Sequence, residues 1–300
     1  MDYRLLLYFT TLIDQGTFTK AAKYLHISQP SLSSAIKKLE DNIGLVLIER
    51  STRNFQLTKE GEIVYKESKK LIQHFNYVEK EIFRLKDSGP LELQIGLIES
   101  VKFWLPDVLN TYNQANPDVR IKLAEVLGLK KVEESLKNYK IHLAITNQRF
   151  KSEEIRSIPI YTENLVALVP GDHPLTEKAS ITFQDIKNDQ FIICKEGFQT
   201  RDDILKEFLE LGISPNIKFE IERFETAYSL VEAGIGITIV PENYIRSFGI
   251  DPRKIKQFTD NHLARTVYIA ILKSRYLPPV VEEFIDITKD FFIEKEEAEQ

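Results

Sequence analysis

Apolar side chains recur at helical spacing near the start of the chain. They predict a helix over residues 2–14, which Gly16 ends in the left-handed conformation. Thr17 then stands where the N-cap of a second helix, over residues 18–25, belongs, and Ser28 does the same for a third helix. The tight turn between the last two helices is typical of a helix-turn-helix unit. The apolar positions of the first helix are Leu5, Leu6, Phe9, Leu12 and Ile13.

After Gly44 the helical spacing gives way to alternation of apolar and polar positions. The segment LVLIERSTRNFQLT predicts two short strands with a basic turn between them, a wing beside the helix-turn-helix. Helical spacing returns in a long helix from Lys59 to about Lys86, capped by Thr58. Asp87-Ser88-Gly89-Pro90 is rich in turn formers and ends this part of the chain.

The long helix carries an apolar stripe close to a coiled-coil seam. Self-association through this stripe would let two recognition helices read two half-sites of DNA. The alternative is that the stripe packs against its own domain. The stripe consists of Val64, Leu71, Phe75, Val78, Ile82 and Leu85, with the polar residue Ser68 at one position of the seam.

From Leu91 strands and helices alternate in two rounds. Strand, helix, strand, helix, strand indicates a parallel α/β sheet, and two such rounds predict two α/β lobes with a cleft between them. The fold class is therefore α/β, with an N-terminal winged helix-turn-helix, a long linker helix and a two-lobed α/β body that resembles the periplasmic-binding-protein architecture. The predicted domains are 1–58 (DNA-binding), 59–88 (linker and dimerisation helix), 91–161 plus 267–296 (lobe I) and 162–266 (lobe II). The family resemblance described below implies that the two-lobed body is an effector domain and that its final strand and helix return to lobe I.

Composition and charge narrow the class of protein. A hydrophobic fraction of 43% fits a globular protein, and no apolar run is long enough to span a membrane. Cys194 is the only cysteine, so we expect no disulfides and a cytoplasmic protein. The net charge of −5 is uneven, with +3 over residues 1–90 and −8 over the remainder. Because DNA affinity depends on local phosphate contacts, an acidic whole does not exclude a DNA-binding module.

Short hydrogen-bonding side chains occupy the polar face of the third predicted helix. Gln29 can form two hydrogen bonds with adenine, and serine hydroxyls can donate or accept. The free N–H groups of the first turn suit a backbone phosphate, and Pro30 fits there because its missing N–H costs nothing. A merely solvated helix face would carry similar residues. The candidate DNA-binding residues of this helix are Ser28, Gln29, Pro30, Ser31, Ser33, Ser34 and Lys37.

Two arginines of the wing are further DNA-binding candidates. Arg53 lies at the predicted tip, where an arginine can enter the narrow minor groove or hold a phosphate. Arg50 can do the same, or can form an ion pair with Glu40 or Glu49 inside the module. Arg53 is thus the stronger candidate for the minor groove.

The stretch from Phe9 to Arg50, together with Leu57, Thr58 and Gly61, resembles the LysR-type transcriptional regulators. Ser34 departs from the family, which often has a basic residue there. The resemblance implies sequence-specific binding to promoter or operator DNA, pairing of the linker helices in a dimer or tetramer, a small-molecule effector and RNA polymerase as a partner. The matching positions include Phe18, Ala21, Ala22, Leu25, Gln29, Pro30, Ser33, Ile36, Leu39, Glu40, Gly44 and Leu47.

Ligands of open α/β sheets collect at the carboxyl ends of strands, beside helix amino ends. Ser100 and Thr146 follow predicted strands, and Thr200 and Arg201 open a predicted helix. Hydroxyls and free N–H groups in such places suit a carboxylate or phosphate, and the effector pocket of the resembled family draws on the same strand ends.

Other interpretations of these residues stay open. Helix capping would explain the hydroxyls as well, and Arg201 has Asp202 or Glu225 as alternative partners. Glu99, next to Ser100, suits a cationic ligand better than an anion, so the charge of the effector is open. Phe224 and Thr226 are weaker candidates for the same site.

Motifs for catalysis, metals or cofactors are not evident in the sequence. The five histidines lack metal-ligand spacing, and neither a GxSxG elbow nor a P-loop occurs. Gly234 and Gly236 fit tight helix-to-strand packing better than a phosphate loop, and Cys194 fits a buried apolar position better than a nucleophile. We therefore predict no cofactor and no enzyme. The alternatives are an enzyme built on the α/β body and a ligand-binding protein without a DNA function.

Overall fold

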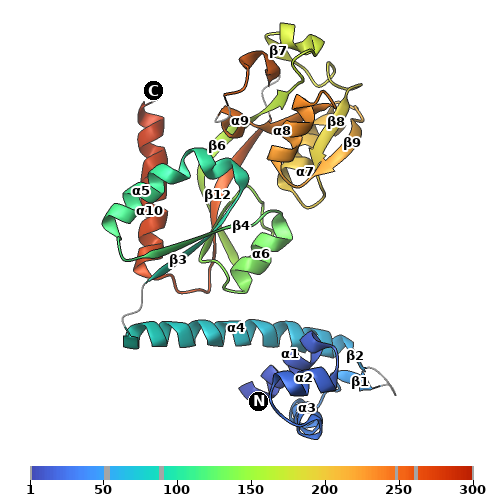
Figure 1. Ribbon diagram of the computed structural model, residues 1–300, viewed down its shortest axis with the longest axis vertical. Coiled ribbons are helices and arrows are strands. Elements are labelled where there is room, and N and C mark those ends of the chain that lie inside the picture. The colour runs from blue at the N-terminus through green and yellow to red at the C-terminus, as the bar shows by residue number, and fades with distance from the viewer. Residues whose placement is uncertain (1, 51–54, 88–90, 247–248, 260–262, 299–300) are drawn as a thin grey trace. The chain divides into compact units, whose positions relative to one another are not determined.

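The computed structural model describes residues 2–50, 55–87, 91–246, 249–259 and 263–298 (Figure 1). The chain divides into two compact units, Met1–Gly89 and Pro90–Gln300. The finer limits predicted for the linker helix and for the two lobes stay predictions, and we keep those lobe names for the parts of the second unit.

Local capping signals set the limits of the first three helices. The Thr17 and Ser28 caps and the Gly16 stop were predicted, whereas the Asp2 cap was not, because residue 2 was placed inside the first helix. The side chains of Asp2, Thr17 and Ser28 each accept a hydrogen bond from a backbone N–H in the first turn of their helix. Gly16 (φ 72°) and Gly44 (φ 71°) end the first and third helices in the left-handed conformation. The helices are α1 (Tyr3–Gln15), α2 (Phe18–Tyr24) and α3 (Gln29–Ile43).

The wing follows α3 and is tied to it. Strands β1 (Ile48–Arg50) and β2 (Phe55–Leu57) pair antiparallel. The carboxylate of Glu40 accepts hydrogen bonds from the N–H groups of Leu47 (2.8 Å) and Ile48 (3.2 Å), which fixes the start of the wing against α3. The connection between β1 and β2 lies outside the described residues.

Helix α4 (Lys59–Asp87) completes the first unit and is the predicted long helix. The Thr58 hydroxyl accepts from the N–H of Gly61 at 2.9 Å, as an N-cap does. Helix α4 packs against α1, and its Ser68 and Ile72 are buried.

Four members of the predicted apolar stripe are exposed, Leu71 at 45%, Phe75 at 41%, Val78 at 39% and Ile82 at 48%. Its first part instead packs within the unit, because Val64 is half-buried against the core and Ser68 is buried. The side chain of Leu85 lies outside the described residues.

The second unit is built on one mixed sheet with helices on both faces (Figure 1). Its main strand order is β4-β3-β5-β12-β6-β10-β8-β9, with β11 pairing with β6 and β7. The strands are β3 (Glu92–Leu97), β4 (Arg120–Glu125), β5 (Leu143–Thr146), β6 (Ile155–Leu168), β7 (Ser180–Ile181), β8 (Gln190–Cys194), β9 (Asn216–Ile221), β10 (Ile237–Pro241), β11 (Ile255–Phe258) and β12 (Ala264–Leu272).

The helices of the second unit follow the predicted alternation. The predicted helix over 102–115 is divided into a short 3₁₀ turn and an α-helix. The helices and 3₁₀ turns of the second unit are η1 (Glu99–Phe103), α5 (Leu105–Ala115), α6 (Leu129–Lys137), η2 (Pro174–Glu177), α7 (Gln199–Glu210), α8 (Phe224–Glu232), α9 (Glu242–Arg246), η3 (Pro252–Lys254) and α10 (Pro279–Ala298).

The prediction of a parallel sheet is correct for three strands in each half and wrong for β6 and β12, which pair antiparallel with β10 and β5, respectively, as well as with each other. The trio β4, β3 and β5 is parallel, and so are β10, β8 and β9. Strands β6 and β12 pair antiparallel with each other over most of their length, and β6 continues to pair with β10. Because β6 and β12 run from one half to the other, they form the two connections between the lobes.

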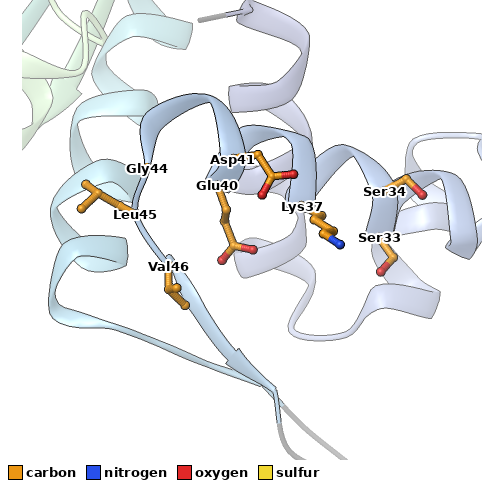
Figure 2. Close-up of a pocket in the computed structure, with 8 residues that line it drawn as sticks. All are labelled: Ser33, Ser34, Lys37, Glu40, Asp41, Gly44, Leu45 and Val46. Atoms are coloured by element: carbon orange, nitrogen blue, oxygen red, sulfur yellow. The ribbon is translucent and has the colours of Figure 1, made fainter.

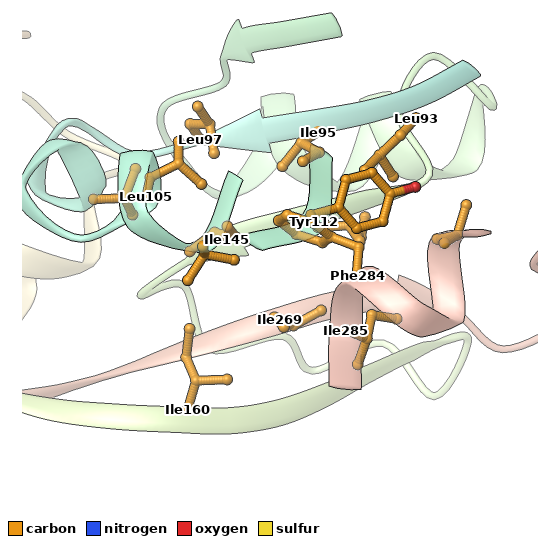
Figure 3. Packing of buried hydrophobic residues seen from close by; sticks show 14 of the residues in the cluster. Leu93, Ile95, Leu97, Leu105, Tyr112, Ile145, Ile160, Ile269, Phe284 and Ile285 are labelled. Atoms are coloured by element: carbon orange, nitrogen blue, oxygen red, sulfur yellow. The ribbon is translucent and has the colours of Figure 1, made fainter. Parts of the chain in front are cut away.

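Alternation along the strands gives each lobe two apolar layers. In lobe I, Leu143 and Ile145 face the core under α5 and α10, whereas Ala144 faces α6. Figure 3 shows the first of these layers, where the Tyr112 ring lies edge-on to Phe284 at 5.5 Å. Lobe II repeats the arrangement, with α7 on one face of its strands and α8 on the other.

Tight packing accounts for the glycine pair between α8 and β10. A Cβ at Gly236 would lie 2.4 Å from the carbonyl oxygen of Gln190, so the neighbouring strand β8 requires glycine there. Gly234 has φ 72° and follows the end of α8. The packing interpretation of this motif is therefore supported over a phosphate loop.

Within the described residues, none of the helices has the length and apolar character needed to cross a membrane.

A buried histidine in lobe I should make the stability depend on pH. His142 is 5% exposed, and its Nδ1 accepts from the N–H of Gln94 at 3.0 Å. Burial, with a smaller contribution from Arg275, lowers the pKa of His142 to about 3. The unfolded chain, with a histidine pKa of about 6.5, therefore binds a proton first as the pH falls.

We expect the free energy of unfolding to decrease below pH 6.5, by about 2 kcal/mol at pH 5 from this residue alone. His142→Asn keeps an acceptor for the Gln94 N–H and removes the titrating group. Urea titrations at pH 8 and pH 5 should show a smaller pH effect in the variant than in the wild type. An equal pH effect in both proteins would assign the dependence to other groups.

Candidate DNA interface and interlobe cluster

The N-terminal half of α3 presents the predicted polar face. Ser28 is the N-cap, and its hydroxyl lies 2.8 Å from that of Ser31. The Gln29 side chain is exposed, and its Oε1 accepts from the Thr19 hydroxyl at 3.2 Å, so α2 orients it. Pro30 is exposed in the first turn.

One turn further on, α3 borders a hollow of about 640 Å³ (Figure 2). Lys37 and Ser34 are exposed, and Ser33 is half-buried. Across the hollow lie Gly44, Leu45 and Val46, where the chain turns into the wing. The polar face of α3 and the root of the wing thus form one concave surface. The side chain of Arg50, and Arg53 entirely, lie outside the described residues, so their predicted roles stay predictions.

In the second unit, predicted strand-end residues meet across the lobes. Arg265, on β12, is 3% exposed. Its Nη2 donates to the Ser100 hydroxyl at 2.7 Å, and its Nη1 donates to the Thr200 hydroxyl at 3.0 Å. Ser100 belongs to lobe I and Thr200 to lobe II, so one guanidinium joins both predicted site residues.

Glu163 completes this arrangement. It is the direct register partner of Arg265 on the neighbouring strand β6, and its Oε1 accepts from Arg265 Nε at 2.8 Å. The two strands that connect the lobes therefore carry a buried ion pair at their crossing point. The Thr200 hydroxyl also accepts from the Asn147 amide at 3.1 Å, which adds a second bond between the lobes.

Glu99 forms a further bond between the lobes. It is 3% exposed, and its Oε2 accepts from the N–H of Phe224 at 2.8 Å, at the amino end of α8. Burial raises the pKa of Glu99, and the Phe224 N–H opposes part of that rise. The Phe224 ring in turn faces the Arg265 guanidinium at 5.9 Å. We call Glu99, Ser100, Asn147, Glu163, Thr200, Phe224 and Arg265 the interlobe cluster.

Three of the predicted effector residues lie outside the cluster or serve it indirectly. Arg201 donates to the carbonyl of Cys194 at 2.7 Å and pairs with Glu220 at 2.8 Å, and not with Asp202 or Glu225 as considered above. Thr226 is exposed on α8. The Thr146 hydroxyl accepts from the backbone of Gln148 at 3.2 Å, which is a capping role at the end of β5.

Comparison with protein families decides the identity of both units. The model of the bacterial regulatory helix-turn-helix protein, lysR family, matches residues 3–62, and the LysR substrate binding domain matches residues 87–292. The chain belongs to the LysR family. It is a LysR-type DNA-binding transcriptional regulator with an effector-binding domain, so the enzyme alternative and the binder without a DNA function are set aside.

Relatives of this LysR regulator match most or nearly all of its length. The uncharacterized HTH-type transcriptional regulator YybE of Bacillus subtilis (strain 168) is 32% identical, over 95% of this chain and 97% of its own. The hydrogen peroxide-inducible genes activator of Dickeya chrysanthemi is 26% identical, over 80% of this chain and 79% of its own. Full-length CbnR complexed with its target DNA shares the fold, with a TM-score of 0.69, 21% identity and coverage of 97% and 99%.

Glu163, Asn147 and Arg265 are the cluster members that the sequence did not single out. A signal was present, because charges of opposite sign stand at both predicted lobe boundaries, next to residues 161/162 and 266/267 of this LysR regulator. Strands that cross between lobes must lie side by side, so such charges are candidates for pairing. Within the described residues there is also no group of three or more His, Cys, Asp or Glu that could hold a metal ion.

Proposed function

We propose that this regulator reads DNA bases with the amino-terminal turns of α3, with Gln29 and Ser33 contacting base edges and Lys37 a phosphate. The observation that carries the proposal is the exposed polar face of α3, bordered by the concave surface that leads into the wing. The N–H groups of the first turn of α3 suit the DNA backbone. Arg50 and Arg53 of the wing belong to the same proposed contact surface.

The proposal includes self-association through α4. Four apolar side chains of its stripe are each about 40–50% exposed within the unit, and burial against a second copy would remove them from water. Two copies would bring two recognition helices to two half-sites of an operator. Dimers or tetramers that act with RNA polymerase in the bacterial cytoplasm complete this proposal.

Effector binding between the lobes is the proposed means of control. The support is that buried polar groups from both lobes converge at the interlobe cluster. A ligand there can shift the regulator between two states if it binds one lobe arrangement more tightly than the other. We place Ser100, Thr200 and Phe224 at this site, with Thr146 at its edge and Arg201 and Thr226 outside it.

A reversible ligand suits this chain better than thiol oxidation, although one relative is named for induction by peroxide. The sole cysteine, Cys194, is 4% exposed. Burial raises the pKa of its thiol to about 12, whereas oxidation proceeds through the thiolate. Cys194 therefore fits the apolar core of lobe II.

A comparison of Gln29→Ala with Lys37→Ala tests the proposed DNA contacts. Gln29→Ala should cost about 1–3 kcal/mol on the cognate operator and much less on random DNA, because only base contacts depend on sequence. Lys37→Ala should weaken both by similar factors and reduce the salt slope by about one.

The operator would first be obtained by selecting genomic fragments with the full-length protein. Fluorescence titrations at several salt concentrations then give both affinities for each variant. Equal losses by Gln29→Ala on cognate and random DNA would remove Gln29 from base recognition and leave it a positioning role.

A further inference from the structure

Two carboxylates of the interlobe cluster, and the carboxylate of Asp203 on α7, each have an oxygen without a hydrogen-bond donor among the described residues. Glu99 Oε1, Glu163 Oε2 and Asp203 Oδ2 are all buried, and no described group donates a hydrogen bond to any of them. All three are carboxylate oxygens, which accept hydrogen bonds and do not donate them when ionised. Burying a carboxylate oxygen without a hydrogen-bond donor costs free energy. A ligand that supplies hydrogen-bond donors would therefore be stabilised at this site.

The Arg265 and Asn147 side chains direct their hydrogen bonds to other oxygens. Arg265 uses its Nε on Glu163, its Nη1 on Thr200 and its Nη2 on Ser100 and Glu163. The Asn147 amide is bonded to Thr200. The Ser100 and Thr200 hydroxyls accept in these bonds. A donor entering the cluster would find carboxylate oxygens that lack partners, whereas a carboxylate or phosphate would bring a further negative charge to the buried Glu99 and Glu163.

The charges in the cluster point the same way. Glu99 and Glu163 are both at most 4% exposed, and Arg265 is the cation that lies among them. Of the other cations that act on Glu99, Lys102 is exposed and Arg223 is paired with Glu125 at 2.6 Å on the surface. The cluster is thus short of one positive charge, and Glu99 is the carboxylate without a cationic partner.

Helix capping does not account for Glu99 in full. Its Oε2 caps the amino end of α8 through the Phe224 N–H. A serine or asparagine there would give the same single bond without burying a charge. A charged side chain kept in a buried place at the junction of two lobes, with one oxygen unused, is the arrangement expected of a ligand-binding group.

We propose that the effector is a small organic amine, whose ammonium group pairs with Glu99, while further donors of the same molecule reach Glu163 and Asp203. This inference rests on the proposed effector site between the lobes and names the chemical class of its ligand. It resolves the charge of the effector in favour of a cation. Asp203 fits because it lies on α7 one turn after Thr200, on the same side of that helix.

Matched probes of opposite charge test the proposal on the full-length protein. Calorimetry would compare benzylamine with benzoate, and butylamine with butyrate, over the millimolar range. We expect both amines to bind and both acids to bind at least tenfold more weakly, because a charged hydrogen bond to a buried partner contributes about a factor of ten or more. Binding of the acids in preference to the amines would overturn the proposal, and so would a lack of amine binding.

Glu99→Gln locates the amine. The glutamine oxygen can still accept from the Phe224 N–H, while its NH₂ replaces the unpartnered oxygen, so amine affinity should decrease about tenfold or more. Glu222→Gln removes an exposed carboxylate that pairs with Lys195 and should leave amine affinity unchanged. Equal amine affinity in Glu99→Gln and wild type would overturn the proposal.

Two further measurements separate the possible failures. If Glu99→Gln does not fold, Asp203→Asn serves instead, because its Oδ1 can still accept from the Gln199 amide and the ion pair that it gives up, at 3.3 Å, is with the exposed Arg149. Asp203→Asn should weaken amine binding several-fold. Unchanged binding in that variant would count against the proposal. Operator binding by the wild type is measured separately. Its absence would contradict the proposed function, whereas operator binding without amine binding would contradict only the ligand class.

Discussion

Arg265→Leu should lower the free energy of unfolding of the effector unit by about 3–5 kcal/mol. Arg265 is buried, donates to three side chains and pairs with Glu163, its register partner at the crossing of the two connecting strands. The substitution leaves the Glu163 carboxylate buried without its cation and removes donors from Ser100 and Thr200. An uncompensated buried charge is among the most destabilising changes in a folded protein.

The measurement is a urea titration followed by the fluorescence of Trp104, the only tryptophan, which is 1% exposed in the core of lobe I. Arg253→Leu is the matched control, because Arg253 is exposed and, among the described residues, its ion pair is with Asp251 on the surface. Arg253→Leu should unfold at the same urea concentration as the wild type.

The double variant Arg265→Leu, Glu163→Leu separates charge pairing from packing. With both charges removed, most of the stability should return, because replacing a buried ion pair with apolar side chains is often neutral. If the double variant is as unstable as Arg265→Leu, the bonds to Ser100 and Thr200 dominate over the ion pair. If Arg265→Leu unfolds like the wild type, the buried pair contributes nothing to stability.

The sequence predicted well those features, such as helix caps, that depend on residues close together in the chain. Thr17 and Ser28 cap their helices because the cap and the N–H that it accepts are three residues apart. The same holds for Gly16 and Gly44, whose left-handed conformations end α1 and α3. Helix limits in the first unit were therefore predicted to within about one or two residues.

Strand β6 shows where such reasoning stops. Only its second part, after Glu163, has a clear apolar pattern, while its first part contains Pro159 and several polar residues. Proline and polar residues weaken a strand signal, so pairing with β12 had to supply what the local sequence lacks. Because the first part of β6 was not predicted as a strand, its antiparallel pairing with β12, and hence the mixed sheet, was not predicted either.

The interlobe cluster could be predicted only in part for a related reason. Ser100, Thr146 and Thr200 stand at strand and helix ends, which a sequence pattern reveals. Arg265 and Glu163 lie 102 residues apart and are joined only by the register of β6 and β12. That register is a property of the folded sheet.

Phe75→Glu should dissociate the regulator and abolish tight operator binding. Phe75 lies in the middle of the exposed stripe of α4, between Leu71 and Val78, and its ring contacts Tyr3 of α1 at 4.2 Å. Pairing of two α4 stripes would bury the new carboxylate in an apolar seam without a partner, which costs far more than the lost ring contact.

The loss of DNA affinity follows from the loss of pairing. When two modules are joined, binding of the second half-site becomes intramolecular, which typically raises the overall affinity by about 10²–10⁴. A dissociated Phe75→Glu protein binds one half-site at a time, so its affinity for the operator should decrease by about 10²–10⁴. Binding to random DNA should change much less, because the basic surface of each module is untouched.

Sedimentation and operator titrations of Phe75→Glu test this directly, with Asn76→Glu as the control. Asn76 is exposed one residue along, about 100° around the helix, so the same charge there points away from the stripe. The control should keep the wild-type mass and operator affinity. A folded Phe75→Glu protein with the wild-type mass would mean that the stripe is covered by something other than a second α4. Half-site reading would then have to be coordinated through the effector domain.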